Sequence, residues 1–310
     1  MIIHTGSRTD IPAYYSRWFY NRIKEGYVLV RNPYYPEQVI GYQLNPKVVD
    51  AICFCTKNPE PMLDRLHEIC EFQQIWFVTI TPYGKEVEPY VPDKEKVMNS
   101  LKRLSKEIGA RRVHWRYDPV FIHEKYTVDF HIQCFEKMAK NLSGYVSSAV
   151  ISFIDLYQKT KKNFPNVRVV TRKEQETLME AFAKTGKKYG ITIRTCCENK
   201  EFAKYGVDVS GCMTQQVMEK SLGYLLKVPK SKLVRQECNC LLGNDIGMYN
   251  TCGHGCLYCY ANYDRKTVCI NMKQHDPESP LLVGVPKAEE KISWSKQESY
   301  CDGQLCFDLF

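Results

Sequence analysis

Apolar segments with β preference recur along the first two thirds of the chain, and each is followed by a stretch with helical periodicity. A period of two indicates a strand, and a period of 3.6 indicates an amphipathic helix. The pattern predicts strands over residues 1–4, 48–55, 74–81, 112–117, 147–154 and 191–196, and helices over residues 14–24, 62–72, 94–108, 127–141 and 173–189.

Strands that alternate with helices of about ten to fifteen residues favour βαβ units and a parallel sheet. We therefore predict an α/β fold that forms a partial, TIM-like barrel of the (β/α)6 type. Residues 27–44 are typical of a hairpin-like insertion near the open end of this barrel. From Ser279 onward the sequence is rich in Pro, Lys, Glu and Ser, so we expect a loosely ordered tail in which Trp294 and the final Cys306-Phe307-Asp308-Leu309-Phe310 could dock.

Bulk properties narrow the class of protein. The 310 residues carry a net charge of +8, from 43 basic and 35 acidic side chains, which is a moderate excess. No run of about 18 apolar residues occurs, and the first residues lack the layout of a signal peptide, so we expect a cytoplasmic protein without a membrane partner. Fifteen cysteines in a reducing compartment favour metal or cluster ligation over disulfides.

Polar and proline-containing segments follow several predicted strands. The clearest are Thr56-Lys57-Asn58-Pro59, Thr79-Ile80-Thr81-Pro82 and Arg116-Tyr117-Asp118-Pro119. Catalytic groups of α/β barrels lie at the carboxyl ends of the strands. Turns are also polar for structural reasons, so each segment by itself is open to both interpretations.

A cysteine loop lies late in the chain, with Cys252, Cys256 and Cys259 in a Cx3Cx2C spacing. Iron–sulfur clusters are usually held by four thiolates, so three would leave one iron open to another ligand. The spacing alone is also compatible with a zinc site or with reduced buried thiols.

The longer string around the loop adds His254, Tyr258, Tyr260 and Ala261. It resembles the CxHxCxYCYA string of radical SAM enzymes related to spore photoproduct lyase. The resemblance implies a [4Fe-4S] cluster whose open iron binds S-adenosylmethionine (SAM). It also implies reductive cleavage of SAM to a 5′-deoxyadenosyl radical, which abstracts hydrogen from a substrate.

Other elements of that family stand upstream of the loop in this chain, in their usual order. The family's cluster loop lies near the N-terminus, so the arrangement resembles a circular permutation. Asp245-Ile246-Gly247-Met248-Tyr249 would then be the family's first strand. The resemblance makes seven residues candidates for contacts with SAM or substrate: Arg8, Asp10, Lys57, Thr79, Thr81, Arg116 and Tyr258.

The chain also resembles an uncharacterised bacterial family, a domain of unknown function with a C-terminal CxxxCxxC loop. That resemblance covers most of residues 1–265 and implies no substrate. We divide the chain into a permuted barrel body (1–195), a cysteine-rich segment that completes the barrel and binds clusters (196–265), and a C-terminal tail (266–310). The Gly-Gly-Glu element by which the radical SAM family contacts the SAM amino group is not evident.

Four more cysteines suggest a second site between the sixth strand and the loop. They are Cys196, Cys212, Cys238 and Cys240, with Cys197 as a neighbour. Four thiolates from three segments could hold a second [4Fe-4S] cluster or a structural zinc ion. The Cx1C spacing is tighter than the usual Cx2C zinc knuckle and favours the cluster.

The leading hypothesis is therefore a radical SAM enzyme of unknown substrate, reduced by an electron donor such as flavodoxin or ferredoxin. One alternative is an iron–sulfur electron-transfer protein without SAM chemistry, since the Gly-Gly-Glu element is missing. Another is a nucleic-acid repair or binding protein, which the positive charge favours weakly because no basic groove with interleaved aromatic residues is evident. A plain zinc protein is the simplest alternative.

Overall fold

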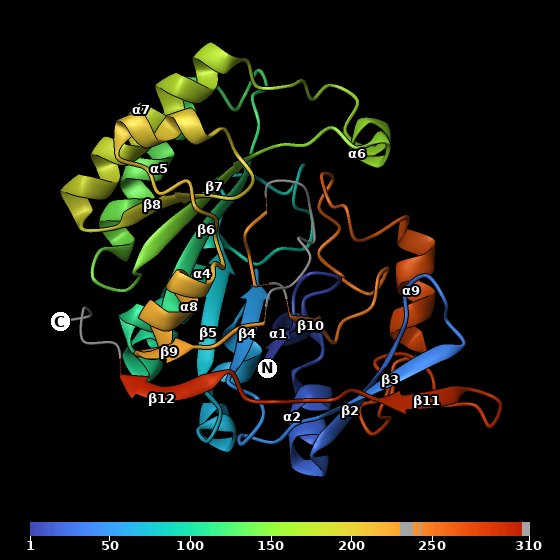
Figure 1. Cartoon of the computed structure of the whole chain (residues 1–310). Helices are drawn as coiled ribbons and strands as arrows, with labels where there is room; N and C mark the ends of the chain where they lie inside the picture. The colour runs from blue at the N-terminus through green and yellow to red at the C-terminus, as the bar shows by residue number, and fades with distance from the viewer. Residues whose placement is uncertain (230–237, 242, 306–310) are drawn as a thin grey trace.

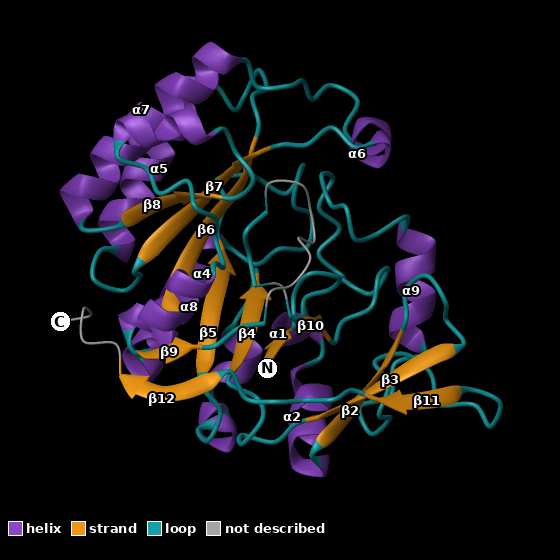
Figure 2. Cartoon of the chain, viewed as in Figure 1, coloured by secondary structure: helices purple, strands orange, loops and turns teal. Residues whose placement is uncertain are grey.

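The centre of the molecule is an open sheet of seven parallel strands, seen in a computed structural model that describes residues 1–229, 238–241 and 243–305 (Figures 1 and 2). The strands pair in the spatial order β10–β1–β4–β5–β6–β7–β8. Their bounds are β1 Ile2–His4, β4 Ala51–Thr56, β5 Gln74–Thr79, β6 Val113–Val120, β7 Ser148–Phe153, β8 Thr192–Thr195 and β10 Asn244–Asp245.

The parallel α/β architecture predicted from the sequence is confirmed, and all six predicted strands belong to this sheet. Within the described residues no pairing joins β8 to β10, so the structure contains an open sheet rather than a closed barrel. The seventh strand, β10, pairs with β1 through Ile3 opposite Asn244 and His4 opposite Asp245. A late segment of the chain therefore lies beside the first strand at one edge of the sheet.

Amphipathic helices connect the strands, and several begin at side-chain caps. Asp93 caps α4, and Thr171 forms a capping box with Glu174 at the start of α7. These caps satisfy backbone N–H groups that have no partner within the helix. The four main helices match the predicted ones closely: α2 Ser16–Glu25, α4 Lys94–Ile108, α5 Val128–Leu142 and α7 Arg172–Tyr189.

The prediction of one continuous helix over residues 62–72 is wrong. The segment forms the short helix α3 (Glu60–Leu63) and a separate 3-10 turn, η1 (Leu66–Ile69). Arg65 between them leaves the helical region, with φ −117° and ψ 12°, so the helical hydrogen bonds stop there.

Alternate residues of each strand point to opposite sides of the sheet, and each side is buried in a core of its own. Phe54 and Trp76 face the larger core with helices α2, α4, α5 and α7, where their rings stack at a centroid distance of 4.1 Å. Cys53 and Phe77 face a smaller core that includes Met218 of α8 (Gln215–Leu222). Strands buried on both faces explain why the sequence is continuously apolar there.

A smaller sheet contains the predicted hairpin and part of the tail (Figure 1). β2 (Tyr27–Arg31) and β3 (Gln38–Gln43) pair antiparallel, as predicted, and β11 (Lys291–Trp294) joins β3 in parallel. β12 (Cys301–Leu305) pairs with β9 (Tyr224–Leu226). The expectation of a loosely ordered tail is therefore wrong for the described residues up to 305, whereas Trp294 docks as the sequence allowed. The expected docking of Cys306-Phe307-Asp308-Leu309-Phe310 lies outside the described residues.

Two physical features order this tail. Leu281, Leu282 and Val283 are buried against the body of the protein, and the backbone of β11 completes an edge of the small sheet. Gly41 leaves room for the Trp294 ring, because a Cβ at Gly41 would lie 2.7 Å from a ring atom. The remaining elements are α1 Ile11–Tyr14, η2 Ala110–Arg112, α6 Gln158–Asn163, η3 Lys200–Tyr205 and α9 Arg265–Lys273.

No helix among the described residues has the length and apolar character needed to cross a membrane.

Candidate metal and cofactor site

A cavity of about 620 Å³ lies at the carboxyl ends of the parallel strands. This is the edge at which α/β sheets place their ligands and catalytic groups. The volume is in the range of about 300–1,000 Å³ found for small-molecule sites. Residues at or just after the carboxyl ends of six of the strands contribute to its lining, among them Arg8, Lys57, Thr79, Asp118, Ser152 and Glu198.

The three cysteines of the Cx3Cx2C loop all line this cavity. The loop follows β10, so the strand beside β1 delivers Cys252, Cys256 and Cys259 to the ends of the other strands. Burial raises the pKa of the Cys252 thiol well above its usual value and that of Cys256 to about 12. Thiols in this environment stay protonated until a metal replaces their protons.

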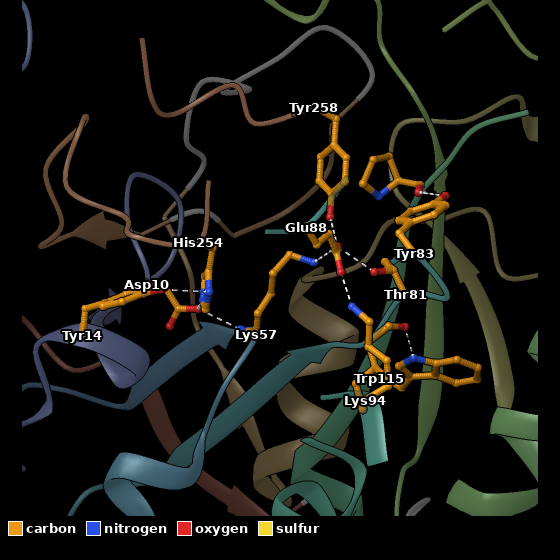
Figure 3. Close-up of polar contacts among 12 residues, drawn as sticks. Asp10, Tyr14, Lys57, Thr81, Tyr83, Glu88, Lys94, Trp115, His254 and Tyr258 are labelled. Carbon is orange, nitrogen blue, oxygen red and sulfur yellow. Dashed lines mark hydrogen bonds and ion pairs between the residues drawn. The ribbon is translucent and has the colours of Figure 1, made fainter. Parts of the chain in front are cut away.

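His254 is fixed between two residues from the start of the chain. Its Nε2 donates to Oδ2 of Asp10 at 2.8 Å, and its Nδ1 accepts from the Tyr14 hydroxyl at 3.1 Å (Figure 3). Asp10 also accepts from Oγ1 of Thr56 at 2.6 Å and from the backbone N–H of Lys57 at 2.8 Å. The cysteine loop is thereby attached to the ends of β1 and β4.

Tyr258 is fixed by a second buried carboxylate, that of Glu88. Its hydroxyl donates to Oε1 of Glu88, which also accepts from Oγ1 of Thr81 at 2.7 Å and from Nζ of Lys57 at 2.8 Å. Oε2 accepts from Lys94 (Figure 3). Burial by itself would raise the pKa of Glu88, but the two ammonium groups lower it to about 2.

Two glycines let the cysteine loop pass close to aromatic rings. A Cβ at Gly253 would lie 2.7 Å from the Tyr14 ring, closer than two carbon atoms can pack. Gly255 adopts φ +69°, a left-handed conformation that L side chains avoid, and a Cβ there would lie 3.0 Å from Tyr90. The loop conformation therefore depends on glycine at both positions.

Six of the seven residues predicted to contact SAM or substrate line the cavity; Thr81 does not. Thr81 is fully buried and donates to Glu88, so its position supports a structural role. Several of the six also have partners within the protein: Arg8 pairs with Asp245 at 3.0 Å, and Lys57 with Glu88. Thr79 stands at the end of β5, where it lines the cavity directly.

The predicted second cysteine group also lies on this cavity. Cys196, Cys197, Cys212, Cys238 and Cys240 all line it, although they come from three separate segments. Sγ of Cys212 lies 3.6 Å from Sγ of Cys196 and 3.5 Å from Sγ of Cys240. Five neighbouring thiols of this kind could hold a metal ion or an iron–sulfur cluster.

These thiols form hydrogen bonds with each other and with the backbone. The contact with the Cys212 thiol and a hydrogen bond that the N–H of Met213 donates to Sγ of Cys240, at 3.3 Å, lower the pKa of Cys240 to about 6. Nowhere in the described ranges are three or more His, Cys, Asp or Glu side chains already arranged to hold a metal ion.

The chain between β1 and the cysteine loop matches a known family. Residues 2–261 match DUF1848, a domain of unknown function. The chain belongs to the DUF1848 family. The DUF1848 match covers the whole seven-stranded sheet and ends just after the cysteine loop, so it includes both cysteine groups. No curated protein matches the chain.

Two acidic residues of this DUF1848 site were missed by the sequence analysis. Glu88 joins Lys57, Lys94 and Tyr258, and the available signals were its place after the strand that ends at Thr79 and the similarity of Glu88-Pro89 to a Glu-Pro segment of the radical SAM family. Glu198 lines the cavity beside the second cysteine group and accepts from the backbone of Phe153 at 2.7 Å. Burial raises the pKa of Glu198 to about 8. Its position directly after Cys197 was the available signal.

Proposed function

We propose that this protein is a radical SAM enzyme that uses Cys252, Cys256 and Cys259 to hold a [4Fe-4S] cluster. The observation that carries the proposal is the shared cavity: the three thiols line the same space as the polar ends of the parallel strands. A cofactor held there would meet residues from most strands of the sheet. This is where an enzyme of the α/β class assembles its reactive groups.

The donor set supports this cofactor. Three thiolates from one loop would leave one iron of a four-iron cluster without a protein ligand. When bound, the cluster supplies the electron that cleaves SAM to a 5′-deoxyadenosyl radical. The remaining chemistry depends on how the chain orients the reactants and excludes water.

The loop is suited to carry such a group because its non-cysteine residues are held rigidly. His254 is bonded to Asp10, Tyr258 to Glu88, and the Tyr260 hydroxyl donates to the backbone oxygen of Ser7 at 2.7 Å. The amide of Asn262 donates to the backbone oxygen of Cys252 at 2.7 Å. A functional site needs this kind of support to keep its ligands in place.

Within the cavity we assign SAM to Thr79, Arg8 and the backbone near Tyr258, which all line it. Thr79 offers a hydroxyl at the end of β5, and Arg8 adds positive charge to the lining while its guanidinium is paired with Asp245. The Lys57 ammonium lies 5.5 Å from the centre of the Tyr258 ring and adds positive charge there. The substrate would occupy the rest of the cavity, and an electron donor of the flavodoxin or ferredoxin kind would reduce the cluster.

The order of the strands supports the proposed permutation. β10 lies beside β1 at one edge, and the other five strands follow in sequence order toward β8. Moving β10 and its loop to the front of the chain would give seven strands in simple sequential order. A partial barrel of the radical SAM type has this order, with the cysteine loop after its first strand.

The test is an anaerobic purification with reconstitution, counting of iron and sulfide, and EPR of the reduced protein with and without SAM. We expect iron at the loop, about four atoms per cluster, and an EPR signal that shifts when SAM is added. Cys256→Ala should remove this signal, whereas Cys134→Ala, on α5 and outside the cavity lining, should keep it. Iron without any response to SAM would favour an electron-transfer protein, and zinc alone would overturn the proposal.

A further inference from the structure

The end of β6 places a buried positive charge against the second cysteine group. Nη1 of Arg116 donates to Sγ of Cys212 at 3.8 Å, while its Nε donates to Oδ2 of Asp118 at 3.1 Å. The Arg116 side chain is only 15% exposed. The sequence made Arg116 a candidate for contact with SAM or substrate, and in the structure its donors are directed to Asp118 and Cys212.

The backbone also brings the thiols together at some conformational cost. Cys197 adopts φ +56°, a left-handed conformation uncommon for residues other than glycine. Cys196 and Cys197 both line the cavity, so this turn presents two consecutive thiols to it. Unfavourable backbone conformations of this kind persist where the surrounding structure holds them, often at functional sites.

A site made only of thiols selects soft metals, chiefly zinc and iron–sulfur clusters. Structural zinc sites are closed by their four ligands. Here Cys196, Cys212, Cys238 and Cys240 border an open cavity, and they share it with the loop cysteines. The position of the four cysteines on this cavity and the Cx1C spacing of Cys238 and Cys240 favour a cluster over a structural zinc ion.

We propose that Cys196, Cys212, Cys238 and Cys240 hold a second iron–sulfur cluster that faces the same cavity as the loop, and that Arg116 is its positive charge partner. Thiolate-bound clusters carry net negative charge, so a buried guanidinium in hydrogen-bond contact with a ligand sulfur stabilises them. The stabilisation is greater for the reduced cluster, which carries one more negative charge. Arg116 therefore acts as a positioning and potential-setting residue of the second cluster.

The second cluster does not depend on SAM chemistry, so the second-cluster proposal and the radical SAM proposal can fail separately. A variant with Cys252, Cys256 and Cys259 all changed to Ala isolates the second cluster. We expect it to retain about four iron atoms per chain and an EPR signal that SAM leaves unchanged. Loss of all iron and sulfide from this folded variant, or zinc in place of iron, would overturn the second cluster whether or not the loop binds SAM.

The role of Arg116 is tested by the reduction potential of the second cluster in the same background. Arg116→Met should lower this potential, because the positive charge that favours the reduced state is gone. Asp118→Asn should raise it, because a negative charge is removed instead. If Arg116→Met alone unfolds, the double variant replaces it, because it leaves no carboxylate at position 118 unpaired. Its potential should then be lower than that of Asp118→Asn, since the two differ only in the Arg116 charge.

Arg31→Met is the matched control, because Arg31 forms a comparable, largely buried ion pair with Glu290, at 2.8 Å, but does not line the cavity. We expect it to leave the potential of the second cluster unchanged. Equal potentials in the loop-deficient background and in its Arg116→Met, Asp118→Asn and double variants would overturn the assignment of Arg116. A lower potential in Arg31→Met as large as that in Arg116→Met would do so as well.

The shared cavity makes one more measurement decisive. If both clusters border the same space, their reduced, paramagnetic forms should interact magnetically when both are present. The reference is the sum of two spectra, one from the loop-deficient variant and one from a variant with Cys196 and Cys212 changed to Ala. We expect the EPR spectrum of the fully reduced protein to be broadened or split relative to this sum. A spectrum equal to that simple sum would overturn the common location.

Discussion

The carboxylate of Asp10 accepts a hydrogen bond from Nε2 of His254 at 2.8 Å, although 244 positions separate the two residues in the sequence. Both side chains are almost completely buried. Asp10 also caps α1 by accepting from the backbone N–H of Ala13. One carboxylate thus starts a helix after β1 and orients the residue between two of the loop cysteines.

Changing Asp10 to Ala should therefore weaken both the fold and the metal site. The change leaves buried donors of Thr56, Lys57 and His254 unpaired, and we expect a loss of about 3 kcal/mol in the free energy of unfolding. Urea denaturation measures this loss, and iron analysis of the reconstituted variant should show less bound iron. Asp10→Asn keeps an acceptor for part of this network, so it should lose less free energy of unfolding and less bound iron. Equal losses in the two variants would contradict a role for these hydrogen bonds.

Glu88 should make the stability of the protein depend on pH in the acid range. Its pKa is lowered to about 2 in the folded state, so its ion pairs stabilise the fold fully above the unfolded pKa near 4.5. This contribution, about 3 kcal/mol, is lost as the pH falls from about 4.5 to about 2. Denaturation at several pH values should show a flatter profile for Glu88→Gln in this window, with lower stability at neutral pH because Lys57 and Lys94 lose their partner.

Glu86 is the matched control for this experiment. The pKa of Glu86 is also lowered to about 2, because Lys125 and Tyr126 donate hydrogen bonds to it. Its side chain is half exposed, so solvent screens the ion pair with Lys125. Glu86→Gln should change the stability by less than about 1 kcal/mol. A change as large as that of Glu88→Gln would show that burial is not the deciding difference.

Comparing Gly255 with Gly26 distinguishes the backbone cost of replacing a left-handed glycine from the steric cost of an added Cβ. Both have positive φ, +69° and +76°, but only Gly255 has a neighbouring ring, that of Tyr90 at 3.0 Å from an added Cβ. Gly26→Ala should cost about 1 kcal/mol from backbone conformation alone. Gly255→Ala should cost more and should also reduce the iron bound at the loop. If iron binding fell equally in both variants, the effect would come from general instability.

Gly41 and Trp294 provide a test of how the C-terminal segment docks. A larger side chain at position 41 must displace the Trp294 ring, so Gly41→Val should destabilise the protein by about 1 kcal/mol despite the β preference of valine. Limited proteolysis should then cut near β11. In a Trp294→Ala background the same change should cost less, and the double-mutant cycle gives the coupling between the two positions. No coupling would mean that the ring does not contact Gly41 in solution.

Local sequence patterns were sufficient to predict most of the sheet and its main helices. Apolar strands and capped amphipathic helices depend on neighbouring residues, so α4 was predicted with its observed bounds. The C-terminal segment was mispredicted because its order comes from pairing with β3 and β9, which lie far away in the sequence. Composition carries no information about such partners.

In the candidate site, too, local sequence predicted which residues are near the cavity but not the contacts between distant segments. The family resemblance, applied to segments at the carboxyl ends of the strands, predicted Lys57, Thr79 and Arg116 as site residues, and all three line one cavity. Which way each side chain points depends on partners that approach in three dimensions. Thr81 turns to Glu88, and Arg116 to Asp118 and Cys212, so two predicted SAM contacts have other neighbours. No pattern within a strand contains this information.

The place of β10 beside β1 also sets the order in which the site is completed during synthesis. The ribosome delivers the chain from the N-terminus, so six strands of the sheet emerge before β10 and the cysteine loop. Cys196 and Cys212 also emerge before Cys252. One edge of the sheet therefore stays unpaired until late in translation, and the loop cysteines reach a scaffold on which most of the cavity wall already exists. Under the proposed function, cofactor loading at the loop would be a late step that follows the folding of the remaining sheet.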